Sequence, residues 1–398
     1  MPDSAADALE AGPDEAWPHF GEDEIAAVAE VLRSGKVNQW TGTRVKQFEQ
    51  AVAVRIGMPH AVALANGSVA LELALRALGV GPGHEVIVAS SSFVASVSCV
   101  ELVGATPVFA DVDRESQNIS AATIEPLITE RTRAVIPVHL AGWPAEMPAI
   151  MALAQARGLS VIEDCAQAIG AEIEGKPVGA FGDASIFSFC QDKIITTGGE
   201  GGMALFREAD AWKRAWEFKD HGKSWDLMQK PSSAPGFRWV HHAIGTNWRM
   251  TEMQAAIGLV QLDKLQGWLQ ARRRNASVWR KEFEPLKLLR QPTPPDGVTH
   301  AYYKYSVFLV PDRLAPGASR DDVLGALIDG GVHALSGFCP EIYREQAFQD
   351  LATETRPVAH ALGETSLAFE VHPTLDPQRL EARAQSAGAI ISRFESDH

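Results

Sequence analysis

The chain has 398 residues, a formal net charge of −14 and a pI of about 5.3. This length exceeds one ordinary hydrophobic core and predicts two domains or one large domain with an appendage. A content of 46% hydrophobic and 22% charged residues is typical of a folded globular protein. So acidic a surface argues against nucleic acid or an anionic membrane as the main partner. It leaves room for a small anionic ligand, which backbone N–H groups at a helix start can bind.

The four cysteines are scattered along the chain, with no pair at metal-ligand spacing. A disulfide framework and a zinc site are therefore not expected, and we predict no bound metal. The first twenty residues are acidic and lack the basic and apolar regions of a signal peptide, and no apolar run of about 18 residues occurs anywhere. These features predict a reduced, cytoplasmic protein.

Seven short β-rich runs alternate with helical stretches in the first half of the chain. This pattern predicts an α/β fold, with a mostly parallel seven-stranded sheet covered by helices. The gap between Phe189 and Gly201 is short for a helical crossover, so an antiparallel strand is expected there. The runs occupy residues 61–65, 85–90, 107–112, 134–140, 160–166, 184–189 and 201–206.

The second half of the chain has a different organisation. Residues 222–245 have no clear period and contain Pro, Ser, Gly and aromatic residues, which predicts a long functional loop. A strongly helical stretch at 250–286 predicts a connector to a small α+β domain, with a strand at 302–310 and a helix at 319–331. We therefore expect an N-terminal tail (1–20), a large domain (21–270, including the 222–245 loop) and a small C-terminal domain (271–398).

Lys193 lies in the segment FSFCQDKIITTGGEGGM, between a β-rich run and a turn rich in Thr and Gly. Such a turn can hold a lysine rigidly while its amine points into a cleft. A single loop lysine is more often a solvated surface residue, so a catalytic interpretation depends on the rest of the sequence.

Polar residues follow two of the predicted strands. Asp164 and Gln167 lie at the end of a run that should be buried, and ligands of open α/β sheets bind at the carboxyl ends of the strands. A carboxylate there can hold a proton on a pyridine nitrogen, although Asp164 could equally cap a helix. Asn66, Gly67 and Ser68 open a helix, where free N–H groups form an anion site or a serine simply caps the helix.

Phe93 follows a third strand and stands among small polar residues. Its ring could lie flat on a planar cofactor at the same edge of the sheet. The alternative is an ordinary core phenylalanine.

Together and in this order, these elements resemble the DegT/DnrJ/EryC1/StrS sugar aminotransferases, a family of fold-type I pyridoxal-phosphate enzymes. The resemblance extends from NQWTGTRVKQFEQAVA near the N-terminus to LGETSLAFEVHPTL near the end. It implies an aspartate-aminotransferase-like three-layer αβα large domain and a small C-terminal domain. Its most specific segments are NGSVALELAL, GHEVIVASSSFVAS, GATPVFADVD, EDCAQAIGA, SFCQDKIITTGGEGG and GTNWRMTEMQAAIGLVQL.

The resemblance implies a role for each candidate residue. Lys193 would form a Schiff base with pyridoxal 5'-phosphate and then move protons during catalysis, while Asp164 would pair with the pyridinium nitrogen. Gln167 would lie near the 3-oxygen of the ring, and Phe93 would stack on the ring. The phosphate would be held by Gly67, Ser68, Ser188 and, from the neighbouring subunit, Asn247, which implies a homodimer with shared active sites.

The implied reaction is the transfer of an amino group from L-glutamate to a keto group of a nucleotide-linked deoxysugar, in the biosynthesis of amino sugars for a polysaccharide or a secondary metabolite. A cyclitol or another non-nucleotide keto substrate, and a non-catalytic regulatory protein that binds the cofactor, remain as alternatives. A dehydratase of the family has histidine in place of the lysine, so Lys193 argues against that activity. The sequence lacks both a GxxxxGK[ST] element and a GxGxxG turn after its first strand, which argues against a P-loop or dinucleotide-binding protein.

Some positions depart from the family pattern. Cys190 and Ile194 stand where many relatives have histidine and asparagine, and SGFCPEIYREQAF replaces a substrate loop that contains histidine and proline in many relatives. The sequence therefore does not fix the nucleotide, the sugar or the carbon that is aminated. In the 222–245 loop, Trp225, Phe237 and Trp239 could cover the base or sugar of the substrate. His221, His300 and Tyr303 could lie at the rim of the site, and surface or packing roles remain open for all three.

Overall fold

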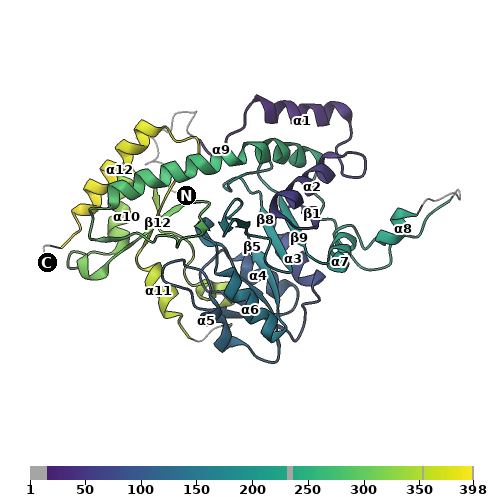
Figure 1. The fold of residues 1–398 in the computed structure, drawn as a ribbon, viewed down its shortest axis with the longest axis horizontal. Helices are drawn as coiled ribbons and strands as arrows, with labels where there is room; N and C mark the ends of the chain where they lie inside the picture. Colours follow the sequence, from purple (N-terminus) through teal and green to yellow (C-terminus); the bar gives the residue numbers. More distant parts are fainter. Residues whose placement is uncertain (1–15, 231–235, 352–353, 397–398) are drawn as a thin grey trace.

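The computed structural model describes residues 16–230, 236–351 and 354–396 (Figure 1). Its centre is a seven-stranded sheet with the order β1-β9-β8-β5-β4-β2-β3. Every neighbouring pair is parallel except those of β9, which runs antiparallel to β1 and β8. All seven predicted strands are confirmed, including the antiparallel one: β1 (His60–Leu64), β2 (Glu85–Ala89), β3 (Thr106–Ala110), β4 (Thr132–Ile136), β5 (Ser160–Asp164), β8 (Ala184–Ser188) and β9 (Gly202–Phe206).

Helices cover both faces of this sheet, because alternate residues of each strand point to opposite sides. In β2, Val86 and Val88 pack in one core with α3, α4 and α7, whereas Ile87 and Ala89 pack in another core with α6. These two buried layers make the large part of the fold a three-layer αβα structure, as predicted. Its helices are α1 (Glu22–Ser34), α2 (Arg44–Ile56), α3 (Gly67–Ala77), α4 (Ala95–Leu102), α5 (Ala121–Ile124), α6 (Met147–Arg157) and α7 (Ala209–Lys219).

The helix α9 (Glu252–Phe283) connects the large sheet to the C-terminal part of the chain. It has 32 residues and is therefore about 48 Å long. Thr251 caps its start by accepting a hydrogen bond from the N–H of Gln254, whose side chain bonds back to Thr251. The helix continues through residue 270 without a break, so the predicted domain boundary falls inside it and stays a prediction.

The C-terminal part is an α+β unit with an antiparallel sheet in the order β10-β12-β14-β13. Its own core contains Trp279 and Phe283 of α9 together with Phe369. The predicted strand and helix of this region are present as β12 and α10. The elements are β10 (Leu289–Arg290), β12 (Tyr305–Leu309), α10 (Arg320–Asp329), β13 (Ala334–Leu335), α11 (Pro357–Gly363), β14 (Ser366–Phe369) and α12 (Pro377–Ser392).

Smaller elements complete the structure. A three-stranded sheet has the order β11-β6-β7, which the sequence pattern did not predict because its strands have only two residues each: β6 (Glu172–Ile173), β7 (Lys176–Pro177) and β11 (Val298–Thr299). Single-turn 3-10 helices occur at Glu125–Leu127, Leu140–Gly142, Pro311–Arg313, Ile342–Arg344 and Gln346–Phe348. Among the described helices, none is both long and apolar enough to cross a membrane.

The predicted loop at 222–245 forms an arm that projects from the body of the molecule (Figure 1). It contains α8 (Trp225–Gln229). The N–H of Ser224 bonds to the carbonyl of Val240, so the outgoing and returning segments of the arm lie side by side at its base. Trp225 packs edge-on against Trp212 and Trp216 of α7, so it anchors the base of the arm, and its contact with substrate stays a prediction. Residues 231–235 of this loop, and residues 1–15 of the predicted tail, lie outside the described residues.

Candidate active site

The candidate residues follow strands that point the same way. β1, β2, β5 and β8 have a common direction, so their carboxyl ends lie at one edge of the sheet. Gly67 and Phe93 follow the first two strands, whereas Asp164 and Ser188 end the other two. The chain leaves β8 and enters β9 at this same edge, and Lys193 lies in the connection between them. The fold therefore brings the predicted residues to the edge where open α/β sheets bind ligands.

Asp164 is the last residue of β5 and only 5% exposed. Ser96 Oγ donates a hydrogen bond to Oδ2 at 3.1 Å, and the N–H of Ala166 donates one to Oδ1 at 3.0 Å. Burial raises the pKa of Asp164 against the opposing effects of these hydrogen bonds and of the positive charge on Lys193. A desolvated carboxylate of this kind gains from a cationic partner.

Gln167 is fixed beside Asp164 by the backbone of the segment after β4. Its Oε1 accepts a hydrogen bond from the N–H of Ala141 at 2.7 Å. Ala141 has a positive φ of 57°, which turns its N–H toward the amide. The buried Gln167 side chain is thus held in one orientation at the edge of the sheet.

The start of α3 packs directly against the end of β8. Asn66 caps the helix by accepting a hydrogen bond from the N–H of Val69 at 3.0 Å. A Cβ atom on Gly67 would lie 2.8 Å from the Cβ of Ser188, so only glycine allows this approach. Ser68 is exposed on the first turn. The helix start and two serine hydroxyls therefore form a cradle suited to an anion.

The amine of Lys193 lies in a polar group of side chains. Its Nζ is 3.3 Å from Asp192 Oδ2 and 3.4 Å from the hydroxyl of Tyr303, and lies 4.9 Å from the centre of the Tyr303 ring. The Tyr303 hydroxyl also donates a hydrogen bond to Asp192. Burial, together with Asp192, raises the pKa of Tyr303. Burial acts to raise the pKa of Asp192, but Lys193 and Tyr303 outweigh it and lower that pKa.

Phe93 and Asn247 differ from the other candidates because both are exposed. The Phe93 ring is 62% exposed and lies one turn before Ser96, whose N–H bonds to its carbonyl. Asn247 lies at the base of the arm, where its backbone pairs with Asp220. In the described part of the chain, Asn247 makes no hydrogen bond to another candidate residue. The neighbouring Trp248 carbonyl accepts a bond from Ala65, so this segment runs beside the end of β1.

Sequence reasoning missed or underrated several residues of this site. Tyr303 was expected only at the rim, yet it contacts the lysine directly, and Ser96 supports Asp164. The spacing of Ser96, one helical turn after Phe93, was the available signal for it. Trp17, in the predicted tail, donates a hydrogen bond from Nε1 to the Lys193 carbonyl, and no pattern within the first twenty residues announced this contact.

Of the other residues singled out in the sequence, Ile194 and His300 are packed in the interior, whereas Cys190 is half-buried and His221 lies on the surface. Ile194 is buried in the core, and the pKa of Cys190 is raised, with burial as the main cause, which disfavours its reactive thiolate form. His300 is buried and stacks on Tyr302 with ring centroids 4.0 Å apart. His221 is exposed.

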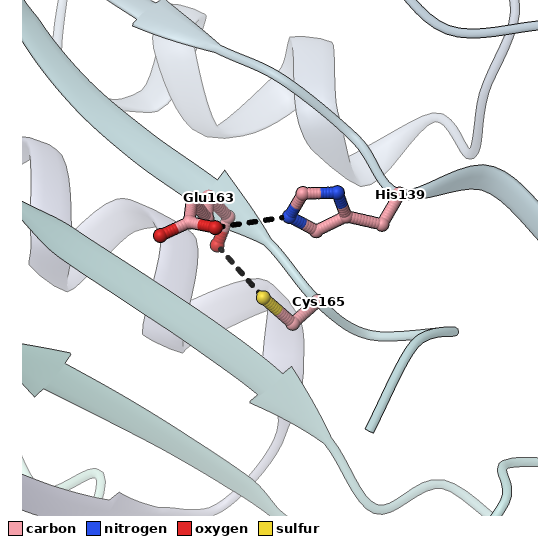
Figure 2. A group of neighbouring side chains, drawn as sticks. All are labelled: His139, Glu163 and Cys165. Carbon is pink, nitrogen blue, oxygen red and sulfur yellow. Dashed lines mark hydrogen bonds and ion pairs between the residues drawn. The ribbon is translucent and has the colours of Figure 1, made fainter. Parts of the chain in front are cut away.

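A second polar cluster lies behind the site, where His139, Glu163 and Cys165 are all buried (Figure 2). His139 Nδ1 accepts a hydrogen bond from the N–H of Ala145, and His139 Nε2 lies 3.2 Å from Glu163 Oε2. Both Glu163 oxygens also accept backbone N–H groups: Gly179 bonds to Oε2, and Phe181 and Gly182 bond to Oε1. Both imidazole nitrogens and both carboxylate oxygens already have hydrogen-bond partners. We therefore interpret this cluster as a structural connection between β5 and the turn at 179–182, and not as a metal site.

Comparison with known proteins identifies the family. The model of the DegT/DnrJ/EryC1/StrS aminotransferase family matches residues 18–384. The chain is 39% identical to the UDP-N-acetyl-3-dehydro-alpha-D-glucosamine 3-aminotransferase of Acidithiobacillus ferrooxidans, over 85% of this chain and 86% of that protein. It is 35% identical to the GDP-perosamine synthase of Escherichia coli O157:H7, over 89% and 91% of the two chains.

Solved structures give the same result. The aminotransferase from Psychrobacter cryohalolentis superposes with a TM-score of 0.93 at 44% identity, covering 95% of this chain and 99% of that one. Fold, site and sequence thus agree with the resemblance noted from the motifs. The chain belongs to the DegT/DnrJ/EryC1/StrS family of pyridoxal-phosphate-dependent aminotransferases.

Proposed function

We propose that this protein binds pyridoxal 5'-phosphate and transfers an amino group from L-glutamate to a keto group of a nucleotide-linked sugar, for amino-sugar biosynthesis in the cytoplasm. The observation that carries the proposal is the convergence of Lys193, Asp164 and the Gly67 cradle at one edge of the sheet. The two curated relatives are named for a UDP-linked and a GDP-linked sugar, which supports the substrate class and leaves the nucleotide open.

The residues present fit the cofactor. Close packing of Gly67 on Ser188 leaves a helix start and hydroxyl groups for a phosphate, and the desolvated Asp164 carboxylate suits a protonated ring nitrogen. Phe93 would cover the face of the ring, Gln167 would lie near the 3-oxygen, and Ser68 would bind the phosphate. When bound, pyridoxal phosphate supplies an electron-accepting pyridine ring.

Each polar residue then has a task in handling protons. Lys193 would hold the cofactor covalently until the amino group of the donor displaces it, and the freed amine would then take the proton from the substrate carbon. Asp164 would keep the ring nitrogen protonated, since its own charge lacks water around it. Tyr303 and Asp192 contact the amine and would orient it, with the tyrosine hydroxyl donating to the carboxylate.

A homodimer with shared sites completes the proposal. Asn247 would reach the phosphate of the neighbouring subunit, and its exposed position supports a contact outside its own chain. The arm carries exposed Phe237 and Trp239, with ring centroids 4.7 Å apart, which supports burial against a second subunit. Mixing Lys193→Ala with Asn247→Ala subunits should restore one complete site per heterodimer. Activity no higher than that of the two variants alone would disprove sharing.

A simple test examines the proposed function as a whole. Purified protein should be yellow, and borohydride should fix the cofactor to the peptide that contains Lys193. Mass spectrometry should then show amination of one or more keto-sugar nucleotides in the presence of L-glutamate. A Lys193→Ala variant should lose turnover. Protein that ignores added pyridoxal phosphate would refute the proposal, and cofactor binding with no turnover of any keto substrate would indicate a regulatory protein instead.

A further inference from the structure

A cavity of about 370 Å³ lies between the N-terminal segment, the residues just before Lys193 and the C-terminal part of the chain. Three of its lining residues contact the lysine: Trp17 bonds to its carbonyl, while Asp192 and Tyr303 contact its amine. The volume is in the range of sites for small molecules. The cavity is therefore placed to hold a ligand that meets the amine.

Arg272 of α9 lines this cavity and is 1% exposed. Its Nη1 donates hydrogen bonds of 3.3 Å to the carbonyls of Tyr302 and Tyr303, and the Trp17 ring covers the guanidinium at 5.1 Å. Its Nε and Nη2 atoms are buried and have no hydrogen-bond partner within the described ranges 16–230, 236–351 and 354–396. These two atoms form the edge of a guanidinium that binds a carboxylate through two parallel hydrogen bonds.

The other charges of the cavity are already paired. Asp192 is engaged by Lys193 and Tyr303, as described above. Glu370 lies 3.6 Å from Lys304 Nζ and 3.5 Å from His372 Nε2. Burial acts to raise the pKa of Glu370, but its histidine and lysine partners outweigh this and lower the pKa, so the carboxylate is ionised. Within the described part of the chain, Arg272 is thus the one cation of the cavity with no carboxylate within ion-pair distance, and Glu370 acts on it only from further away. A buried charge of this kind is costly.

We propose that this cavity is the donor subsite of the enzyme, in which Arg272 binds a carboxylate of the amino acid whose ammonium group is brought to Lys193. This inference rests on the proposed transamination. A zwitterion fits the cavity because Asp192 and Glu370 oppose a phosphate or diphosphate with several negative charges but attract an ammonium group. Trp17 closes the subsite, since it lies over Arg272 and bonds to the lysine backbone at once.

Two measurements on the cofactor-loaded protein test this subsite. Glutarate, a dicarboxylate without an amine, is titrated by calorimetry, and L-glutamate is titrated in the half-reaction followed by the absorbance of the bound cofactor. Arg272→Gln should weaken both by about tenfold or more, because a two-bond charged contact is lost. Arg272→Lys keeps the charge and a donor for the backbone carbonyls but loses the fork, and should weaken both by about threefold to tenfold.

Arg207→Gln is the matched control. The Arg207 guanidinium also bonds to backbone carbonyls, those of Ala180, Phe181 and Gly182, and does not line the cavity. It should leave both affinities unchanged while lowering the melting temperature. If Arg272→Gln fails to fold, Arg272→Lys decides the question.

The outcomes separate the subsite from the proposed function. Half-reaction turnover with wild-type affinities in both Arg272 variants would overturn the subsite and leave the transaminase standing, as would absence of glutarate binding to the wild type alongside normal turnover. Glutarate binding that depends on Arg272, in a protein that converts no amino donor, would uphold the carboxylate site and refute the transaminase.

Discussion

The indole of Trp17 holds the backbone of Lys193, because its Nε1 donates a 3.0 Å hydrogen bond to the lysine carbonyl across 176 positions of sequence. The same ring packs edge-on against Trp268 with centroids 5.1 Å apart. The described end of the N-terminal segment is therefore part of the wall behind the lysine. The position of the amine depends on this contact as well as on the turn that follows it.

Trp17→Phe keeps one aromatic ring but removes the N–H donor together with the second ring of the indole. We expect the free energy of unfolding to fall by about 1 kcal/mol, the usual net value of one hydrogen bond. Turnover of the folded protein should also fall, by about threefold to tenfold, because the lysine amine is no longer held in one position. Urea unfolding measures the free energy of unfolding, steady-state kinetics measure the turnover, and a pH titration of the cofactor absorbance reports on the lysine.

Trp212→Phe is the control for this variant. Trp212 also donates an indole hydrogen bond of 3.0 Å to a backbone carbonyl, that of Ala61. Ala61 lies near the start of β1, at the opposite end of this strand from the site. Trp212→Phe should cost similar stability and leave turnover and absorbance unchanged. Equal turnover in the two variants would show that Trp17 acts only through stability.

Ser96→Ala removes the hydroxyl that bonds to Asp164. That bond lowers the pKa of the carboxyl against the dominant effect of burial, so its loss should raise the pKa further and weaken the pairing with a protonated ring nitrogen. We expect cofactor affinity and turnover to fall by about threefold to tenfold. Ser96→Thr, which keeps a hydroxyl, should recover part of the loss. Ser92→Ala should have a smaller effect, because the Ser92 hydroxyl lies 3.3 Å from Ser96 Oγ and does not bond to Asp164 itself.

Glu163→Gln tests the interpretation of the buried cluster in Figure 2. The carboxylate accepts bonds from three backbone N–H groups, so replacing one oxygen by an NH₂ group should lower the free energy of unfolding by about 2–4 kcal/mol. Urea unfolding measures the loss, and Glu125→Gln in an exposed pair with Arg157 should change little. A rise in the melting temperature of the wild type on adding zinc, absent in Glu163→Gln, would instead identify a metal site.

His300 should make stability depend on pH. Burial lowers the pKa of His300 from 6.5 to about 3, so the folded state binds fewer protons than the unfolded state between these values. The free energy of unfolding should therefore fall as the pH drops through this window, by about 1–2 kcal/mol from pH 7 to pH 5.

The matched variant for this effect is His300→Gln, which can still accept the bond from the N–H of Tyr302. Its unfolding free energy should lose this part of the pH dependence. Because all other titrating groups are shared, the difference between the two proteins should shrink on acidification. Parallel curves for the two proteins would contradict the assignment.

The sequence predicted the elements whose signals are local. The strands of the large sheet are buried on both faces and read as continuous apolar runs, and glycine-rich stops end the helices between them. Asp164 and Lys193 could be identified because the end of a predicted strand, and the turn that follows it, can be located from the sequence alone. The packing of Trp225 was not predicted, since its partners Trp212 and Trp216 belong to another helix and no local pattern records that contact.

Contacts between distant segments could not be predicted in this way. Trp17, Tyr303 and Arg272 reach the surroundings of Lys193 from three separate parts of the chain, and each has an ordinary local sequence. The two-residue strands β6, β7 and β11 likewise exist only through tertiary pairing. These features depend on how the C-terminal part folds back on the large sheet, for instance through the bond from the N–H of Ser92 to the carbonyl of Cys339.

The antiparallel placement of β9 has a consequence for how this protein can change over time. The parallel pairs β2–β3 and β4–β5 are joined by the helices α4 and α6 on the faces of the sheet, where extra residues can bulge into solvent. The connection between β8 and β9 never leaves the ligand-binding edge, because both of its ends are bonded there, with Phe189 joined to Gly201 and Gln191 joined to Gly199. An insertion or deletion between residues 190 and 200 would therefore displace Lys193 itself. We expect this segment to accept substitutions such as those at Cys190 and Ile194 while its length stays fixed.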